Sequence, residues 1–364
     1  MLFLRYRAEM DVLSDVLRTV RLTGAVFFPM ETSSPWADEI PAASAFAEIV
    51  LPGAQQVVSY HIVTEGVCWA ALQGGSPVRL EAGDILVIPH GDAYIMSSAP
   101  GLPSQMSAEM VLEFFREMAA GGLPGVVVEG GGGPDRAKVI CGFLGCDIRP
   151  FNPVLEALPG LVHIRRHPAT AAEDRLKPVI EFALAESRQQ RSGGRCVLLR
   201  LSEVLFVEVI RRYLDALPAD HRGWLAGLRD PSVGPALTRL HGRPAHAWTL
   251  ERLARDVAVS RSVLAERFTQ IVGQPPMRYL ACWRMQLAAR MLADSAAKVS
   301  AVALDVGYDS EASFSRAFKK IVGVAPATWR ERARSAATPP SRASVRRVRR
   351  PPRVPATMSH RKRN

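Results

Sequence analysis

The feature that most constrains the fold is a pattern of two short helices and a tight turn that occurs twice after residue 248. In the first copy, Thr249 and Ser260 stand at positions where hydroxyl side chains cap helices. In the second copy, Ser300 is the expected cap of the first helix, and Tyr308-Asp309-Ser310 leads into the second. Gly307 provides the second turn, because glycine adopts a positive φ without a Cβ clash. Each copy has the apolar spacing of a helix-turn-helix unit.

A predicted helix over Pro275–Ala293 joins the two units. Pro276 suits its first turn, and about 17 residues at 1.5 Å each make a rod of ~25 Å. Two recognition helices on such a rod are spaced to enter successive major grooves, ~34 Å apart on one face of DNA. The side chains expected to face inward are Val263, Leu264, Phe268 and Ile271 in the first recognition helix and Phe314, Phe318 and Ile321 in the second.

Charge is distributed unevenly along the chain. Residues 332–364 carry eleven Lys and Arg and no acid, which equals the whole formal net charge of +11. Residues 236–331 have a net charge of +6, and residues 1–235 a net charge of −6. This asymmetry favours a polyanion as the partner of the C-terminal half. The segment 333–364 consists mainly of Pro, Arg, Ser and small residues and is predicted to be disordered.

Residues 10–168 are predicted to be β-rich, because short runs of β-branched and aromatic residues alternate with Gly and Pro. Many short strands with glycine-rich turns are typical of a barrel or a sandwich. One amphipathic helix, Met10–Leu22, precedes them. The predicted strands are Ala25–Pro29, Val57–Val63, Val67–Leu72, Pro77–Leu80, Asp84–Pro89, Arg136–Leu144 and Gly160–Ile164.

Residues 172–235 have the 3.6-residue period of helices. Two apolar stripes, one beginning at Leu176 and the other at Val197, are separated by the break Arg191–Gly194. The hairpin has more apolar surface than one small face needs, which leaves two interpretations open. It packs on its own barrel, or it associates with a second copy of the chain to form a homodimer.

The C-terminal motifs also carry a family resemblance. The segment Gly307–Lys320 (GYDSEASFSRAFKK), followed by Trp329-Arg330 and preceded by Trp283-Arg284-Met285, resembles the signature of AraC/XylS-type transcription regulators. The resemblance covers residues 236–332 and implies promoter DNA as the partner, with RNA polymerase as a further candidate. It implies that DNA is read by Arg261, Ser262, Ala265 and Glu266 in the first unit and by Glu311, Ala312, Ser315 and Arg316 in the second.

The chemistry of these side chains suggests different roles. Arg316 is the best candidate for a bidentate contact to guanine. Lys319, Lys320 and Arg284 are better placed for phosphates than for bases. Glu266 either accepts a hydrogen bond from cytosine or, the interpretation we favour, pairs with a neighbouring arginine.

The N-terminal region resembles a cupin-type sensor domain. Gly83–Gly91 has the spacing G-x5-P-x-G, and Ser59, His61 and Glu65 follow the spacing of the first cupin motif. Only His61 and Glu65 remain of the usual metal ligands, so no metal or other cofactor is expected. Two interpretations of His61, Glu65, Trp69 and Tyr94 stay open: they line a barrel pocket for an organic effector, or they fill the barrel interior.

These observations predict an α+β multidomain protein: an N-terminal cupin-like β-barrel, a helical linker hairpin and a C-terminal all-α domain with two helix-turn-helix units. We expect a cytoplasmic transcription regulator that is no enzyme and does not enter membranes. The five cysteines form no CxxC pair, and Cys141 and Cys146 are either packed apolar groups or a redox pair. The alternatives are a cupin metal enzyme with a helical appendage and a non-specific DNA-binding protein.

Overall fold

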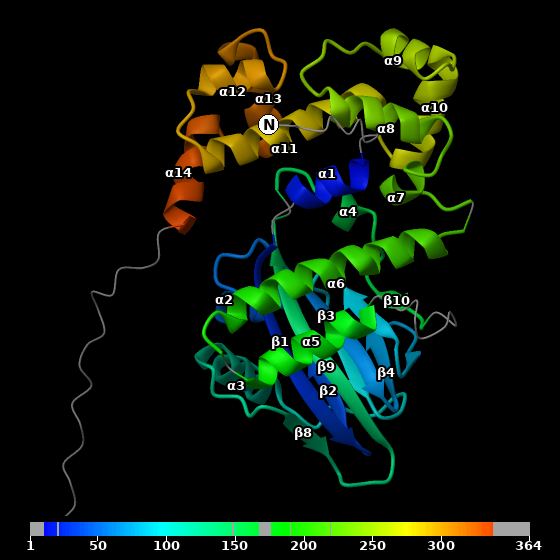
Figure 1. Cartoon of the computed structure of the whole chain (residues 1–364), viewed down its shortest axis with the longest axis vertical. Coiled ribbons are helices and arrows are strands. Elements are labelled where there is room, and N and C mark those ends of the chain that lie inside the picture. The colour runs from blue at the N-terminus through cyan, green and yellow to red at the C-terminus, as the bar shows by residue number, and fades with distance from the viewer. Residues whose placement is uncertain are drawn as a thin grey trace, which may run out of the picture.

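The computed structural model describes residues 11–19, 22–147, 149–166, 176–189, 191–218 and 220–337. It confirms the predicted α+β class, because a β-rich N-terminal part is followed by linker helices and an all-helical C-terminal part (Figure 1). Helix α1 (Val12–Thr19) lies between the two parts. Within the described ranges, no helix is both long enough and apolar enough to cross a bilayer.

The strands of the N-terminal part form a six-stranded and a four-stranded sheet. The first has the order β10-β6-β3-β9-β1-β8 and the second β2-β7-β4-β5. Neighbouring strands run antiparallel, except that β1 and β8 are parallel. The strands are β1 (Leu22–Ser33), β2 (Ala37–Ile40), β3 (Gln56–Glu65), β4 (Val67–Leu72), β5 (Val78–Glu81), β6 (Ile85–Ile88), β7 (Tyr94–Ser97), β8 (Val127–Gly130), β9 (Arg136–Cys146) and β10 (Val162–Ile164).

The space between the two sheets is filled by side chains. Leu86, Ile88 and Cys141 from the larger sheet meet Leu80 and Met96 from the smaller one, and all five are buried. The sequence did not identify the helices that accompany this part of the fold. These are the 3-10 helix Ala43–Ala45, α2 (Ala47–Val50), α3 (Ala108–Ala120) and α4 (Pro153–Glu156).

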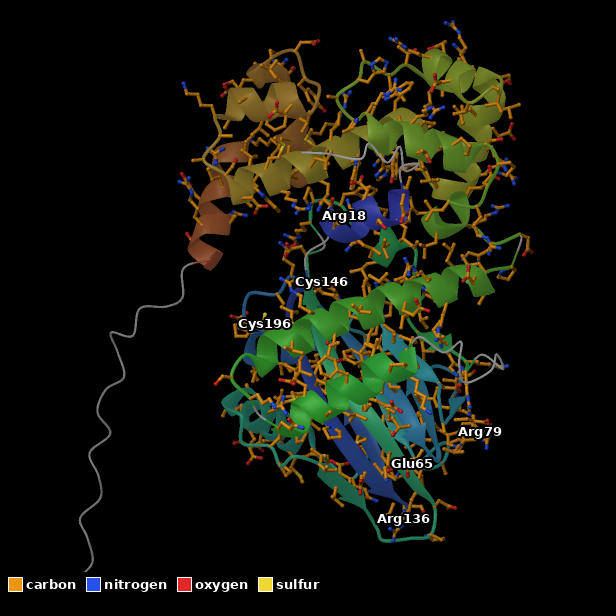
Figure 2. The ribbon with its side chains drawn as sticks, in the orientation of Figure 1. Arg18, Glu65, Arg79, Arg136, Cys146 and Cys196 are labelled. Carbon is orange, nitrogen blue, oxygen red and sulfur yellow. The ribbon has the colours of Figure 1, made fainter. Side chains whose placement is uncertain are left out.

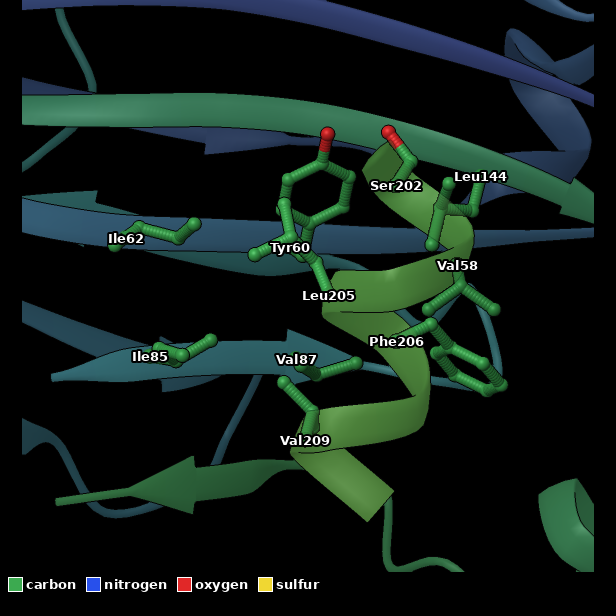
Figure 3. A pocket seen from close by; sticks show the side chains of 10 residues that line it. All are labelled: Val58, Tyr60, Ile62, Ile85, Val87, Leu144, Ser202, Leu205, Phe206 and Val209. Carbon is green, nitrogen blue, oxygen red and sulfur yellow. The ribbon is translucent and has the colours of Figure 1, made fainter. Parts of the chain in front are cut away.

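The linker hairpin consists of α5 (Leu176–Gln189) and α6 (Gly194–Ala216). Helix α6 packs across the six-stranded sheet and buries Leu205, Val209 and Ile210 there. Figure 3 shows α6 over β3 and β6, with Ser202 near Tyr60. A cavity of about 20 Å³ remains beneath the helix. The predicted packing of the hairpin on its own barrel is therefore present, while self-association stays a prediction.

The C-terminal part is all-helical. Helix α11 runs between two groups of helices, with α9 and α10 near one end and α12 and α13 near the other (Figure 1). The helices are α7 (Trp224–Gly227), α8 (Val233–Gly242), α9 (Leu250–Asp256), α10 (Arg261–Val272), α11 (Pro276–Asp294), α12 (Val299–Asp305), α13 (Glu311–Val322) and α14 (Pro326–Ala337).

Two of the three predicted helix caps form as expected, and Ser310 caps α13 in the same way. The hydroxyls of Thr249, Ser260 and Ser310 each accept a hydrogen bond from the backbone N–H three residues further on. The prediction for Ser300 is wrong: α12 begins at Val299, one residue earlier, with Lys298 at its N-cap. A serine inside the first turn lies past the position from which its side chain would cap the helix.

Two further predictions are corrected. Val263 does not face inward, because its side chain is 51% exposed, whereas Leu264 and Phe268 are fully buried. The predicted start of the disordered tail, residue 333, is too early, because α14 continues to Ala337. The rest of that tail, like residues 1–10, lies outside the described residues.

Helix α1 holds the helical part against the β-rich part. The Arg290 guanidinium donates to the carbonyl oxygen of Arg18 at 2.6 Å, and Figure 2 places Arg18 at this junction. The backbone N–H of Phe151 donates to Gln286 Oε1 at 3.0 Å. Also in α1, Asp15 Oδ2 lies 2.9 Å from His241 Nδ1. These contacts fix α11 and α8 relative to the barrel.

Candidate nucleic-acid interface

The first recognition helix, α10, presents a polar face to solvent. Leu253 and Ala254 of α9 pack against Leu264 and Phe268 of α10, and all four are buried. Between the helices, Ala258 has a φ of 56°, which is the left-handed conformation that this turn requires. The predicted reading residues Arg261, Ser262 and Glu266 are exposed, and Ala265 is half-buried.

Two hydrogen bonds organise that face. Arg261 Nη1 donates to Glu251 Oε1 of α9 at 2.8 Å, and this bond lowers the pKa of the Glu251 carboxyl. Glu266 Oε1 accepts from Gln270 Nε2 at 3.0 Å. The arginine of this face is therefore held by Glu251, and the favoured pairing of Glu266 with an arginine does not occur among the described residues.

The second recognition helix, α13, presents a matching face. Phe314 and Phe318 are fully buried beneath it. The predicted reading residues Glu311, Ala312 and Arg316 are exposed, Ser315 is half-buried, and Lys319 and Lys320 are exposed. Arg316 makes no hydrogen bond or ion pair with any residue that the structure describes. Its five N–H donors are therefore available to a partner.

Arg284 lies on α11 and is held by backbone carbonyl oxygens. Its half-buried guanidinium donates through Nε to the carbonyl oxygen of Pro244 at 2.7 Å and through Nη2 to that of His246 at 2.8 Å. Nη1 donates to the carbonyl oxygen of Gly307 at 3.3 Å. Three backbone carbonyl oxygens thus accept hydrogen bonds from the guanidinium that we expected to contact phosphate.

The two reading faces stand at the ends of a stiff rod. Helix α11 has 19 residues, which at 1.5 Å each make ~28 Å. Its apolar side chains Tyr279, Leu280 and Trp283 pack against the first unit, and Met285 and Leu292 pack against the second. Both recognition helices therefore rest on one helix and keep their polar faces in solvent.

The structure separates the four residues predicted to line the effector pocket. His61 and Tyr94 lie between the sheets, with His61 Nε2 2.7 Å from the Tyr94 hydroxyl. Trp69 and Tyr94 border a groove of about 430 Å³ that is also lined by Glu39. Glu65 is exposed and pairs with Lys138 at 3.0 Å, at the end of the sheet away from the helical part (Figure 2).

The electrostatics between the sheets favour neutral groups. Burial lowers the pKa of His61 to about 3, so its imidazole is uncharged at pH 7. Its Nδ1 lies 3.1 Å from Cys141 Sγ. Burial also raises the pKa of the Cys141 thiol well above its usual value. Among the described residues, no group of three or more His, Cys, Asp and Glu side chains is arranged to hold a metal ion.

Cys141 and Cys146 lie on opposite faces of β9. Cys141 packs between the sheets, and Cys146 packs in the cluster on the other side, with the linker and α1. Both thiols are buried and free. This arrangement favours the apolar packing interpretation over a redox pair, because a disulfide requires Cβ atoms within about 4.5 Å of each other.

The comparisons with known proteins agree with the two-part architecture. Residues 11–215 match the family described as "Cupin", and residues 253–332 match the "Helix-turn-helix domain" family. A "Putative AraC-like transcription regulator" of Streptomyces antibioticus is 32% identical over 328 residues, or 88% of this chain and 99% of the relative. A relative with the same description in Streptomyces lividans is 31% identical over 88% of this chain and 98% of its own length. The "HTH-type transcriptional regulator AlkR" of Acinetobacter baylyi is 28% identical over 88% of this chain and 99% of its own length.

Proposed function

This chain belongs to the AraC-like transcription regulators with an N-terminal cupin domain, and from that premise we propose that one copy reads two successive major grooves of promoter DNA. The observation that carries the proposal is the pair of exposed polar faces, on α10 and α13, at the two ends of α11. A rod of ~28 Å is commensurate with one helical turn of DNA, ~34 Å, once the recognition helices extend beyond its ends.

Within the second face, we propose that Arg316 reads a guanine and that Lys319 and Lys320 bind phosphates. Arg316 is exposed, and its guanidinium fork, which has no partner among the described residues, matches guanine O6 and N7. The two lysines follow within one helical turn and are exposed. On the first face, Arg261 is the base-reading candidate, because Glu251 already holds its guanidinium in one orientation.

We propose that the N-terminal domain, residues 10–168, modulates DNA binding through a small molecule. The groove of about 430 Å³ beside Trp69 and Tyr94 has the size of sites that hold such ligands. The hairpin (172–235) and α1 connect this domain to the DNA-binding domain (236–332). A ligand acts on DNA binding only if it prefers one arrangement of these parts over another. The proposed activity is binding rather than catalysis.

The test begins with DNA selected from a random library by the full-length protein. We expect a bipartite site with two conserved blocks. Arg316→Ala is expected to weaken binding to that site by ~1–3 kcal/mol and to relax one base position. Arg332→Ala, an exposed arginine on α14, is the matched control for loss of one positive charge.

The outcomes distinguish the alternatives. If Arg316→Ala leaves both the affinity and the base preference unchanged, the assignment of Arg316 is wrong. If no sequence is enriched at physiological salt, the protein is a non-specific binder and the proposal fails.

A further inference from the structure

Two units that read DNA together must be held in a fixed relative orientation, and a single helix between them controls only part of it. A helix sets a distance, but the units at its ends also roll about its axis unless other contacts hold them. In the part of the chain that the structure describes, such a contact is centred on Arg284 near the middle of α11.

The Arg284 guanidinium bonds to both units at once. Nε and Nη2 donate to the carbonyl oxygens of Pro244 and His246, in the loop that leads into the first unit. Nη1 donates to the carbonyl oxygen of Gly307, in the turn of the second unit. The guanidinium carbon also lies 5.8 Å from the centre of the Tyr308 ring, within the range of a cation–π contact. A planar fork with five donors is suited to reach three carbonyls at once.

The two segments that Arg284 joins also touch each other directly. A Cβ on Gly307, which has a φ of 85°, would lie 2.5 Å from the carbonyl oxygen of Ala245. The loop itself is held in shape, because Trp248 Nε1 donates to the carbonyl oxygen of Arg243 at 3.0 Å and the His246 ring packs edge-on against Trp248. The loop 243–248, called the wedge below, is therefore held in one conformation and packs against the turn at Gly307 in the second unit.

We propose that Arg284 is a positioning residue: it joins the loop 243–248 to the turn at Gly307 and thereby fixes the angle between the two recognition helices. This inference rests on the proposed reading of two grooves, and it replaces the phosphate contact that the sequence predicted for Arg284. It assigns to this side chain control of half-site spacing rather than of affinity for either half-site.

Arg284→Lys separates the two roles. A lysine keeps the positive charge that a phosphate contact needs, but its compact ammonium does not span three carbonyls in a plane. A phosphate role therefore predicts near wild-type binding for Arg284→Lys. A positioning role predicts that Arg284→Lys behaves like Arg284→Ala.

The matched control is Arg330→Ala. Arg330 also donates to two backbone carbonyls, those of Leu292 and Ala297, but both belong to the second unit and its end of α11. Its loss removes the same chemistry without releasing one unit from the other. A second variant, Gly307→Ala, forces the wedge and the turn apart by a different route and leaves Arg284 intact.

The experiment measures binding of the full-length protein to the selected bipartite site, to the same site with one base pair inserted or deleted between the blocks, and to each block alone. One base pair rotates a block by ~34–36° about the DNA axis, so a rigid pair of readers is expected to lose about tenfold or more in affinity. Wild type and Arg330→Ala should keep this spacing penalty. Arg284→Lys should bind the correct site about tenfold more weakly, bind single blocks nearly as well as wild type, and show a spacing penalty below about threefold. Gly307→Ala should lower the spacing penalty as well, and its binding to the block read by the first unit should stay near wild type.

Amide hydrogen exchange without DNA provides an independent measurement. Exchange in segments 243–248 and 305–310 should accelerate in Arg284→Lys and stay at the wild-type rate in Arg330→Ala. If Arg284→Lys retains both the spacing penalty and slow exchange, Arg284 does not position the units. If wild type itself shows no bipartite site, the two-groove proposal fails and the positioning role in DNA reading fails with it, whatever the exchange rates show.

Discussion

Tyr279→Phe is the substitution that tests most sharply how the DNA-binding part is held to helix α1. The Tyr279 hydroxyl accepts a hydrogen bond from Trp224 Nε1 at 2.7 Å and lies 2.8 Å from His241 Nε2. The Asp15 carboxylate accepts from His241 Nδ1–H at 2.9 Å, and burial lowers the pKa of His241. Nε2 of the neutral ring therefore accepts the proton of the Tyr279 hydroxyl. The hydrogen-bonded series Trp224–Tyr279–His241–Asp15 therefore joins α7, α11, α8 and α1.

The expected cost follows from the groups left without partners. Phenylalanine fills nearly the same space, so the cavity term is small. Trp224 and His241 are both buried, at 3% and 4% exposure. Trp224 Nε1 would lose its partner and His241 would lose the partner of Nε2 while keeping Asp15 at Nδ1. An unsatisfied buried polar group costs about 1–3 kcal/mol. We therefore expect a loss of roughly 3 kcal/mol, which lowers the melting temperature of a unit of 150–250 residues by roughly 6–12 °C.

Thermal unfolding followed by tryptophan fluorescence measures this loss, because Trp224 belongs to the hydrogen-bonded series and the Trp283 ring centre lies 4.2 Å from that of His241. Tyr213→Phe is the control: the Tyr213 hydroxyl makes no hydrogen bond with any described residue, so a shift of less than about 2 °C is expected. If Tyr279→Phe also melts within 2 °C of wild type, the hydrogen-bonded series does not stabilise the junction between the DNA-binding part and α1.

Two other perturbations have outcomes fixed by charge. Burial, aided by a hydrogen bond with Glu129, raises the pKa of Asp38 to about 8. Since this pKa lies above the unfolded value of about 3.9, wild type loses stability as the pH rises from about 4 to 8. The melting temperature of Asp38→Asn minus that of wild type should therefore increase from pH 5 to pH 8. A difference that stays constant over this range would contradict the raised pKa. Residues 338–364 carry nine Lys and Arg. Their deletion should make the slope of log K against log [salt] for DNA binding shallower by ~0.9 per lost phosphate contact and leave the preferred DNA sequence unchanged. A changed sequence preference would refute the non-specific role of the tail.

Local signals in the sequence were sufficient to locate the helix-turn-helix units. Thr249, Ser260 and Ser310 cap helices because a hydroxyl in that position satisfies a free N–H whatever surrounds it. Gly307 has the predicted positive φ for the same local reason. The misplaced cap at Ser300 and the exposed Val263 show the limit, because helix phase and burial depend on which neighbours pack against the helix.

The contacts that hold the parts together were beyond the reach of sequence patterns. Asp15 and His241 are 226 residues apart, and no periodicity relates them. Arg284 has the positive charge expected of a residue that contacts phosphate, and only the fold brings the three carbonyls to it. The four residues predicted for the effector pocket were separated for a similar reason. A bulge in the pairing of β3 with β9 between Val63 and Glu65 interrupts the register before Glu65.

Hydroxyl-radical footprinting of one full-length protein on its selected site tests the central claim most directly. If α10 and α13 read successive major grooves, the protein should protect two windows on one face of the DNA, about 10 base pairs apart. A single window, or two windows on opposite faces of the duplex, would contradict it.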